Sequence, residues 1–340
     1  MKKIIFLLLI SLLLVSVGCA RQSNNNILSF KYGVIYTSNL HNQSKIVLLS
    51  QNWNIVKEFN LNVGGLQKAH IYKEKLYIPV TGIPSNPGNE ILEFNMKTGS
   101  KRYIKTKELP IKLAIVDNFL YVIHNTSMDS GILTKINLED NKIIKEKRLD
   151  GVLRGIASAK DEIFVFADNP FRKEQSIYEL DKDLNEMKIR INKQTAFHTD
   201  SLYFNGKFLI INNAKNDYSG PTNKIFLLEN QNASMNIINL TENAPYQIFR
   251  NNDNIVVAHY DFPTRSGKKV TVWDNELNFK KGYELKNNLY LSHMNDNIFY
   301  SLDVDYDLYQ YDSNDFTLLS INRLKKINGM VISDFFVFDQ

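Results

Sequence analysis

Three basic residues, Lys68, Lys112 and Arg154, recur at intervals of about 43 residues along the chain. Each lies shortly before a run of β-branched and aromatic residues, and His198 and Asp200 precede the next such run. If these runs are equivalent strands of a repeating fold, the cations lie at one level. Like charges at a concave, partly desolvated mouth create a positive field that binds anions. The five residues therefore predict an anion or ligand site, and ordinary solvated strand ends are the alternative interpretation.

The elements that must position these residues are short strands that repeat along the chain. One kind of apolar run follows tight polar turns such as Asp117-Asn118 and Asn205-Gly206, which tolerate the positive φ of two-residue hairpins. A second kind of run follows each of the first seven, and helical periodicity is sustained nowhere. Four strands in each period of about 43 residues are typical of a β-propeller. The runs of the first kind are Val34–Tyr36, Leu76–Ile78, Leu120–Val122, Ile163–Val165, Phe208–Ile210, Ile255–Val257, Ile298–Tyr300 and Phe335–Val337.

The third repeat resembles a known family. Residues 120–125, 132–137 and 140–144 look like the YVTN-type (YncE-like) repeat of bacterial surface and periplasmic propellers. Residues 95–99 of the second repeat resemble the Asp-x-x-Thr-Gly turn of that family. The resemblance implies a propeller fold across residues 30–340 and brings no catalytic motif with it.

We predict an all-β chain that forms a β-propeller with four antiparallel strands per blade. Seven blades fit best, with residues 329–338 closing the ring against the N-terminal blade, because closure removes open sheet edges. Eight blades are the alternative, which requires a strand at residues 27–30. The connections between second and third strands are the long ones, and loops on a rigid scaffold tend to carry function. These predicted loops are Thr81–Asn89, Asn125–Gly131, Asp168–Ser176, Asn212–Asn223 and Asp261–Lys269.

The N-terminus has the parts of a secretory signal. Met1-Lys2-Lys3 precedes an almost wholly apolar stretch from residue 4 to residue 17. The sequence Ser16-Val17-Gly18-Cys19 resembles the lipobox of bacterial lipoproteins. This resemblance implies that residues 1–18 are removed as a signal peptide and that Cys19 is lipidated. The polar residues after it predict a flexible tether over 19–28, and the repeats predict one propeller domain over 29–340. The expected location is the extracytoplasmic face of the cell membrane, and an ordinary signal with an incidental cysteine is the alternative.

Catalytic and metal-binding patterns are absent from the sequence. It contains no Gly-x-Ser-x-Gly elbow, no His-Glu-x-x-His pair and no glycine-rich phosphate loop. His124 and His259 occupy equivalent positions, but in the third and sixth repeats, too far apart for a zinc ion whose ligands lie within about 2.3 Å. We therefore predict no catalytic residue, no metal site and no cofactor.

The amino-acid composition indicates which classes of partner the protein can bind. The 340 residues include 41 basic and 36 acidic residues, a formal net charge of +5, so the chain lacks the polycationic character of a nucleic-acid-binding protein. A single cysteine excludes an internal disulfide. We expect a monomeric, lipid-anchored binding module whose long loops meet a protein, a cell-wall polymer or an anionic ligand. The alternative is a propeller hydrolase or lyase acting on an anionic glycan or lactone at the channel mouth.

Overall fold

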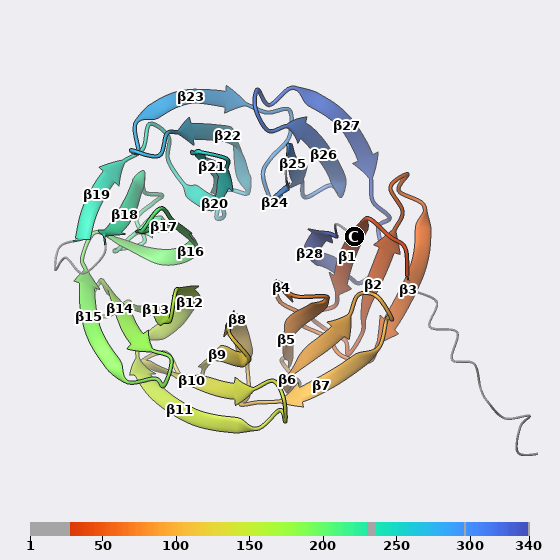
Figure 1. The fold of residues 1–340 in the computed structure, drawn as a ribbon, viewed down its shortest axis with the longest axis horizontal. Helices are drawn as coiled ribbons and strands as arrows, with labels where there is room; N and C mark the ends of the chain where they lie inside the picture. The colour runs from red at the N-terminus through yellow and green to blue at the C-terminus, as the bar shows by residue number, and fades with distance from the viewer. Residues whose placement is uncertain (1–27, 230–234, 296, 339–340) are drawn as a thin grey trace, which may run out of the picture.

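The computed structural model describes residues 28–229, 235–295 and 297–338. These residues form 28 β-strands and no helix, arranged as seven four-stranded antiparallel sheets around a central axis (Figure 1). The prediction of an all-β propeller with seven blades of four strands is confirmed. No helix in this part of the chain is long and apolar enough to cross a membrane. The predicted signal peptide and Cys19 lie outside the described residues.

Each blade is built from the channel outward. Blade 1 contains β28 (Val331–Val337), β1 (Tyr32–Thr37), β2 (Ser44–Leu49) and β3 (Ile55–Leu61). Blade 2 contains β4 (His70–Tyr72), β5 (Lys75–Ile83), β6 (Asn86–Asn95) and β7 (Lys101–Lys105). Blade 3 contains β8 (Pro110–Val116), β9 (Phe119–Asn125), β10 (Ser130–Asn137) and β11 (Ile143–Asp150). Blade 4 contains β12 (Val152–Ala159), β13 (Glu162–Asn169), β14 (Glu174–Asp181) and β15 (Glu186–Asn192).

The remaining three blades repeat the same order. Blade 5 contains β16 (Thr195–Phe204), β17 (Lys207–Lys215), β18 (Lys224–Glu229) and β19 (Met235–Asn239). Blade 6 contains β20 (Pro245–Asn251), β21 (Asn254–Asp261), β22 (Ser266–Trp273) and β23 (Phe279–Glu284). Blade 7 contains β24 (Leu291–Asn295), β25 (Ile298–Leu302), β26 (Asp307–Asp312) and β27 (Leu318–Arg323).

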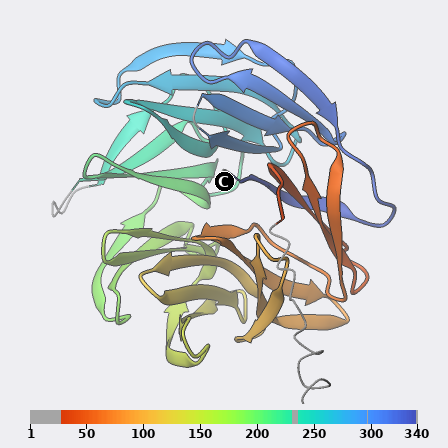
Figure 2. The same cartoon turned by 45° about the vertical axis from the view of Figure 1, so that its right-hand side comes forward.

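The two ends of the described chain meet in blade 1. Strand β28 pairs antiparallel with β1, from Tyr32 opposite Val337 to Thr37 opposite Val331 (Figure 2). The sequence pattern grouped Phe335–Val337 with seven other runs of the first kind. Those seven lie in the second strands of the blades, whereas Phe335–Val337 is part of the inner strand of the first blade. Residues 28–30 form no strand. The eight-bladed alternative is wrong, because the last strand completes the first blade.

The hydrophobic core of the described residues is divided into seven clusters, one between each pair of neighbouring blades. Alternate side chains of β28 serve both of its interfaces: Phe335 packs toward blade 7 and Phe336 toward blade 2. Gly33 leaves room for this closure, since a Cβ there would lie 2.0 Å from the Phe336 ring. Burying one such side chain contributes about 2–3 kcal/mol, so closure is a large term in stability.

The connections define two faces of the ring. We call the face with the second-to-third connections the long-loop face and the opposite one the short-turn face. On the short-turn face, the predicted turn residues Asp117 and Asn205 have positive φ values of 53° and 48°. All five predicted long loops are shorter than predicted, because the flanking strands extend into them. For example, β5 and β6 extend to Ile83 and Asn86, and β22 begins at Ser266.

Candidate functional site

Five inner strands share a one-residue β-bulge near the long-loop face. The pairing skips Ile111, Arg154, Thr199, Tyr246 and Ser333 in β8, β12, β16, β20 and β28. A bulge re-aims the side chains beside it, and the register makes the residues after the bulges equivalent. Blades 2 and 7 have residues at the same register, so we call these seven positions the inner ring. In order from blade 1 to blade 7 they are Asp334, Lys68, Lys112, Gly155, Asp200, Gln247 and Ser292.

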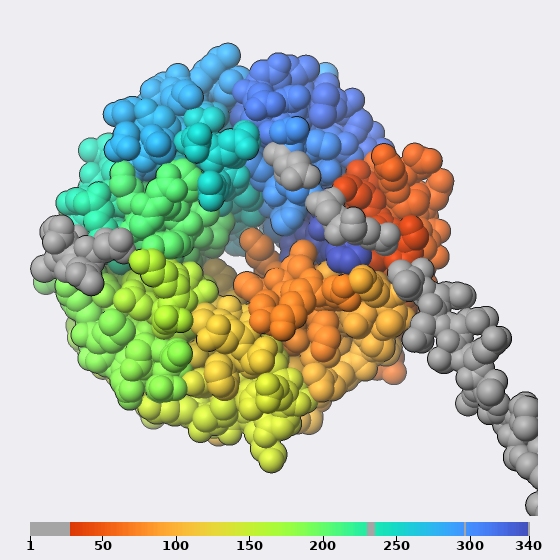
Figure 3. Space-filling view, in the orientation of Figure 1, coloured from red at the N-terminus to blue at the C-terminus, as the bar shows by residue number. Residues whose placement is uncertain are grey.

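Four of the predicted site residues lie on or beside this ring. Lys68, Lys112 and Asp200 occupy ring positions, and Arg154 is the bulge residue directly before the ring position of blade 4. Burial, together with the positive charge of Lys68, lowers the pKa of Lys112 to about 8. The carboxylate of Asp200 opposes this effect on the Lys112 pKa, and Arg154 adds to it. The four groups therefore act on one another around the channel, whose hollow is visible in Figure 3.

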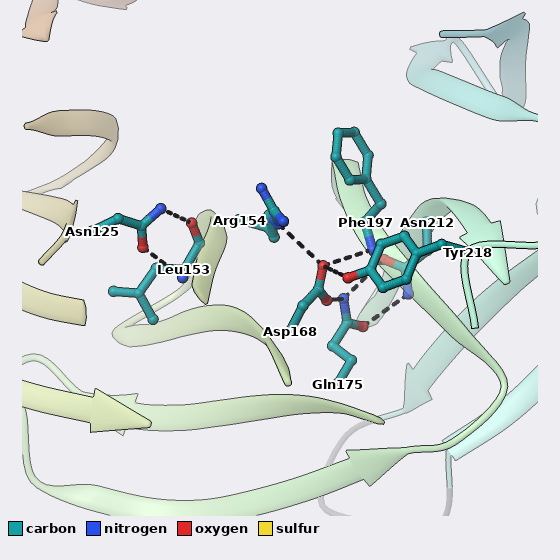
Figure 4. Close-up of polar contacts among 8 residues, drawn as sticks. All are labelled: Asn125, Leu153, Arg154, Asp168, Gln175, Phe197, Asn212 and Tyr218. Carbon is teal, nitrogen blue, oxygen red and sulfur yellow. Dashed lines mark hydrogen bonds and ion pairs between the residues drawn. The ribbon is translucent and has the colours of Figure 1, made fainter. Parts of the chain in front are cut away.

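Arg154 is not a free cation. Its Nε lies 3.3 Å from Oδ2 of the buried Asp168, and its guanidinium lies 5.2 Å from the centre of the Phe197 ring. Asp168 also accepts hydrogen bonds from the Phe197 backbone N–H (3.0 Å), the Tyr218 hydroxyl (3.2 Å) and Nε2 of Gln175 (3.0 Å), as Figure 4 shows. Burial raises the pKa of Asp168, while these donors and Arg154 lower it. This carboxylate, which sequence reasoning missed, neutralises the third predicted cation.

His198 does not reach the rim. Its side chain is 4% exposed and its ring stacks on Phe166 with centroids 3.8 Å apart. Gly155 covers the ring closely, since a Cβ there would lie 2.0 Å from Nδ1. Neither ring nitrogen has a hydrogen-bond partner among the described residues, and burial lowers the His198 pKa well below its usual value. His198 is thus a neutral packing residue between blades 4 and 5.

Asp200 is engaged by backbone groups. Its Oδ1 accepts the Ser201 N–H (2.9 Å) and its Oδ2 accepts the Ile248 N–H of blade 6 (3.2 Å). The carboxylate therefore joins two blades. His198 is buried between blades and Asp200 accepts two backbone N–H groups, so the structure gives both residues a role in joining neighbouring blades.

A second set of equivalent residues lies at the long-loop end of the second strand of each blade, within the strand in blades 1 to 6 and directly after it in blade 7. In blades 1 to 5 these strand-end residues hydrogen-bond the start of the next blade, whereas the last two take no such bond in the described chain. From blade 1 to blade 7 they are Thr37, Thr81, Asn125, Asp168, Asn213, Tyr260 and Asp303. Asn125, for example, donates to the Leu153 carbonyl (3.1 Å) and accepts its N–H (2.8 Å).

Where those bonds are lacking, a pocket of ≈ 240 Å³ lies between blades 6, 7 and 1. Tyr260, Tyr290 and Tyr306 line it together with Phe262 and Arg265. A pocket of mixed aromatic and polar character is the usual form of a ligand site. Sequence reasoning did not find it, because its residues come from three blades and differ in type at equivalent positions, as Tyr260 and Asp303 do.

The long-loop face also presents exposed hydrophobic side chains. Six of its seven loops carry one, while the described turns of the short-turn face carry none that is large and exposed. Phe171 is the most accessible at 80%. From blade 1 to blade 7 the six are Leu40, Met128, Phe171, Tyr218, Phe262 and Val304, with none in blade 2.

The two equivalent histidines have a structural role. His124 and His259 each place Nδ1 against a carbonyl of the preceding connection, Glu108 at 3.2 Å and Asn243 at 2.9 Å. Each Nε2 contacts a threonine hydroxyl of the third strand, at 3.0 Å and 2.8 Å. Burial lowers the pKa of both to about 4. Within the described ranges, no group of three His, Cys, Asp or Glu side chains is arranged to hold a metal ion.

Solved structures resemble this chain in fold. A functionally unknown protein from Desulfotomaculum acetoxidans aligns with a TM-score of 0.62 at 13% identity, over 85% of this chain and 94% of that one. BamB from Moraxella catarrhalis aligns with a TM-score of 0.57 at 10% identity, over 90% and 89%. The computationally designed protein Ika8 aligns with a TM-score of 0.59 at 8% identity, over 87% and 86%. No protein family and no curated protein matches the sequence.

Proposed function

We propose that this protein is a lipid-anchored, extracytoplasmic propeller that acts as a monomer and binds a partner protein with its long-loop face. The observation that carries the proposal is the set of six exposed hydrophobic side chains on that face. Other exposed hydrophobic side chains lie along the strands, most of them outer strands, but of the two faces of the ring only the long-loop face carries them in its loops, among the described residues. Exposed hydrophobic groups on one face of a domain can mark an interaction surface. A protein partner fits such a surface better than a polyanionic wall polymer, which would require an excess of basic residues.

The pocket between blades 6, 7 and 1 provides the expected centre of the interface. Interface energy concentrates where an aromatic or aliphatic side chain of the partner fills a desolvated pocket. Phe262 is 49% exposed beside Arg265, so the pocket offers both an apolar wall and a cation. We infer that it receives an apolar side chain with an acidic neighbour.

The start of the described chain supports the orientation of the proposed anchor. The Leu28 N–H donates to the Lys97 carbonyl (2.8 Å) in the turn between β6 and β7, on the short-turn face. Nine residues from Cys19 to residue 27 span at most about 30 Å. A lipid on Cys19 would hold the short-turn face toward the membrane and leave the long-loop face pointing away. In this proposal the chain joins the YVTN-type surface propellers that its third repeat resembles.

Site-specific crosslinking in the native cell tests the binding face. A photoreactive phenylalanine at Phe171 or Phe262 should crosslink to the same partner protein. The matched control is Phe279, which is 45% exposed but lies on the outer strand β23. Adducts from Phe279 alone, or none from either loop position, would contradict the proposed interface.

The anchor is tested separately. Cys19→Ser should abolish incorporation of labelled palmitate and release the protein from the membrane fraction. A Cys19→Ser protein that stays in the membrane fraction would refute lipid anchoring but would leave the crosslinking result unaffected.

A further inference from the structure

We propose that Lys68 and Lys112 form a subsite for an oxyanion group, a carboxylate or a phosphate, at the long-loop end of the channel. The subsite does not depend on which protein the long-loop face binds. The proposal follows from a contrast within the inner ring. Its acidic and amide side chains are hydrogen-bonded to backbone groups, and its two lysines are not.

The acidic and amide side chains of the inner ring are occupied by neighbouring backbone groups. Asp334 accepts the Phe335 N–H (3.0 Å) and, across the blade boundary, the Ala69 N–H (2.8 Å). Asp200 accepts one N–H from its own strand and one from blade 6. Gln247 exchanges two hydrogen bonds with the Ser292 backbone of blade 7, at 2.9 Å and 2.7 Å. Each of these three residues joins its own blade to the next one.

The two lysines of the ring make no such contact. In the described part of the chain, neither ammonium group has a hydrogen bond or an ion pair within 4.0 Å, although many other cations do. Lys135 of blade 3, for example, is buried and lies 2.8 Å from Asp183 in the β14–β15 turn of blade 4. Lys112 is half-buried, so its charge is not fully hydrated. The Asp334 carboxylate interacts electrostatically with Lys68, and the Asp200 carboxylate with Lys112, but neither carboxylate forms a salt bridge with its lysine in the described chain. A partly buried ammonium without a directly contacting anion is costly, and an anion that binds it removes this cost.

Their placement suits a shared anion. Lys68 and Lys112 occupy the same register in the adjacent blades 2 and 3, and the charge of Lys68 lowers the pKa of Lys112. An oxyanion between them would replace this repulsion with two attractions. Each lysine supplies a flexible point charge with three donors, which suits an oxyanion of variable shape. Asp168 already neutralises Arg154 in blade 4, so the free positive charge is concentrated in blades 2 and 3.

The oxyanion could belong to a small free molecule or to an acidic side chain of a bound protein, and the experiment separates the two. Inorganic phosphate represents the free molecule and a hexaglutamate peptide represents the acidic segment, with hexaglutamine as its neutral control. Binding is measured by calorimetry at constant ionic strength, set with sodium chloride, on the full mature chain.

The variants are Lys68→Met, Lys112→Met and the control Lys73→Met, which removes a lysine from the short-turn end of the same blade as Lys68. We expect at least one probe to bind the unmodified protein and each ring variant to weaken it by tenfold or more. Lys73→Met should change affinity by less than twofold. Binding of phosphate alone indicates a free anion, and binding of hexaglutamate alone indicates an acidic segment.

A second readout guards against misfolding of a variant. In the unmodified protein, acetic anhydride footprinting read by mass spectrometry should show Lys68 and Lys112 protected at least threefold by the bound probe, with Lys73 unchanged. The proposal is overturned if neither probe binds, if the ring variants bind as tightly as Lys73→Met, or if protection is equal at all three lysines.

Discussion

The seven equivalent strand-end positions divide the long-loop face into two regions. From blade 1 to blade 5 they are short polar side chains that hydrogen-bond the next blade. In blades 6 and 7 they are Tyr260 and Asp303, and both line the pocket instead. The same backbone position thus stabilises the ring in one region and surrounds an open pocket in the other.

The difference shows how a closed ring can keep an open pocket at its rim. Each blade boundary has its own hydrophobic cluster, so the polar bonds at the rim are not needed everywhere. At the boundaries of blades 6, 7 and 1, the strand-end residues Tyr260 and Asp303 make no side-chain hydrogen bond to the next blade in the described chain, and both line the pocket. We therefore expect substitutions in the fastened region to change stability and substitutions in the pocket to change binding.

The largest effect is expected for Asp168→Asn. The amide leaves Arg154 without its salt-bridge partner. It also places an N–H₂ group where Asp168 accepts hydrogen bonds from Gln175, Phe197 and Tyr218. The free energy of unfolding should therefore fall by about 3 kcal/mol. Tyr260→Phe at the equivalent position removes only a hydroxyl and should cost under about 0.5 kcal/mol. Urea unfolding measures both. Equal losses in the two variants would show that the two regions do not differ.

The next largest effect is expected from pH, and it should be the same in both regions. His124 and His259 have folded pKa values of about 4, below the usual 6.5, so the unfolded state binds more protons between these values. Stability should therefore fall as pH is lowered from 7 to 5, by about 2 kcal/mol per histidine. Asp334 has the opposite effect on the pH dependence of stability. Burial raises its pKa in the folded state to about 6, so the folded state binds more protons than the unfolded state and gains stability as pH falls.

Urea unfolding of His124→Gln and His259→Gln across this pH range checks the assignment. Each variant should remove a similar part of the pH dependence, since the two imidazoles make equivalent hydrogen bonds. A pH profile unchanged in both variants would mean that other groups cause it.

A smaller effect is expected for Gly155→Ala in the fastened region. The added methyl group would press on the His198 ring, and such overpacking costs about 1–2 kcal/mol. The double variant Gly155→Ala/His198→Ala should recover part of that loss, because the truncated side chain makes room. Thermal and urea unfolding of the four proteins give the coupling energy. Additive losses would show that the close contact does not limit packing.

The smallest effect on stability is expected for Phe262→Ser in the pocket. Phe262 is about half exposed, so unfolding free energy should change by under about 0.5 kcal/mol. Crosslinking of the partner from position 171 should nevertheless fall at least fivefold. A large loss of stability with unchanged crosslinking would reverse the roles of the two regions.

Much of the fold could be predicted because the repeat is local. Strands such as Leu120–Val122 and turns such as Asn205-Gly206 carry β-propensity and positive-φ residues in the sequence itself. The candidate site was predicted in part. Register counting located Lys68, Lys112 and Asp200 at one level. It could not place Asp168 against Arg154, because that contact depends on how the side chains of two paired strands turn toward each other in the folded blade.

The sequence alone determined the number of strands per repeat, the repeat length of about 43 residues and the common level of Lys68, Lys112 and Asp200, because these follow from short-range alternation and spacing. Only the tertiary structure decided that Phe335–Val337 completes the first blade and that His198 is buried. It also decided that the acids of the inner ring bond backbone amides while Lys68 and Lys112 do not. These features depend on which side chains of neighbouring blades come into contact. The spacing of residues along the chain does not specify those contacts.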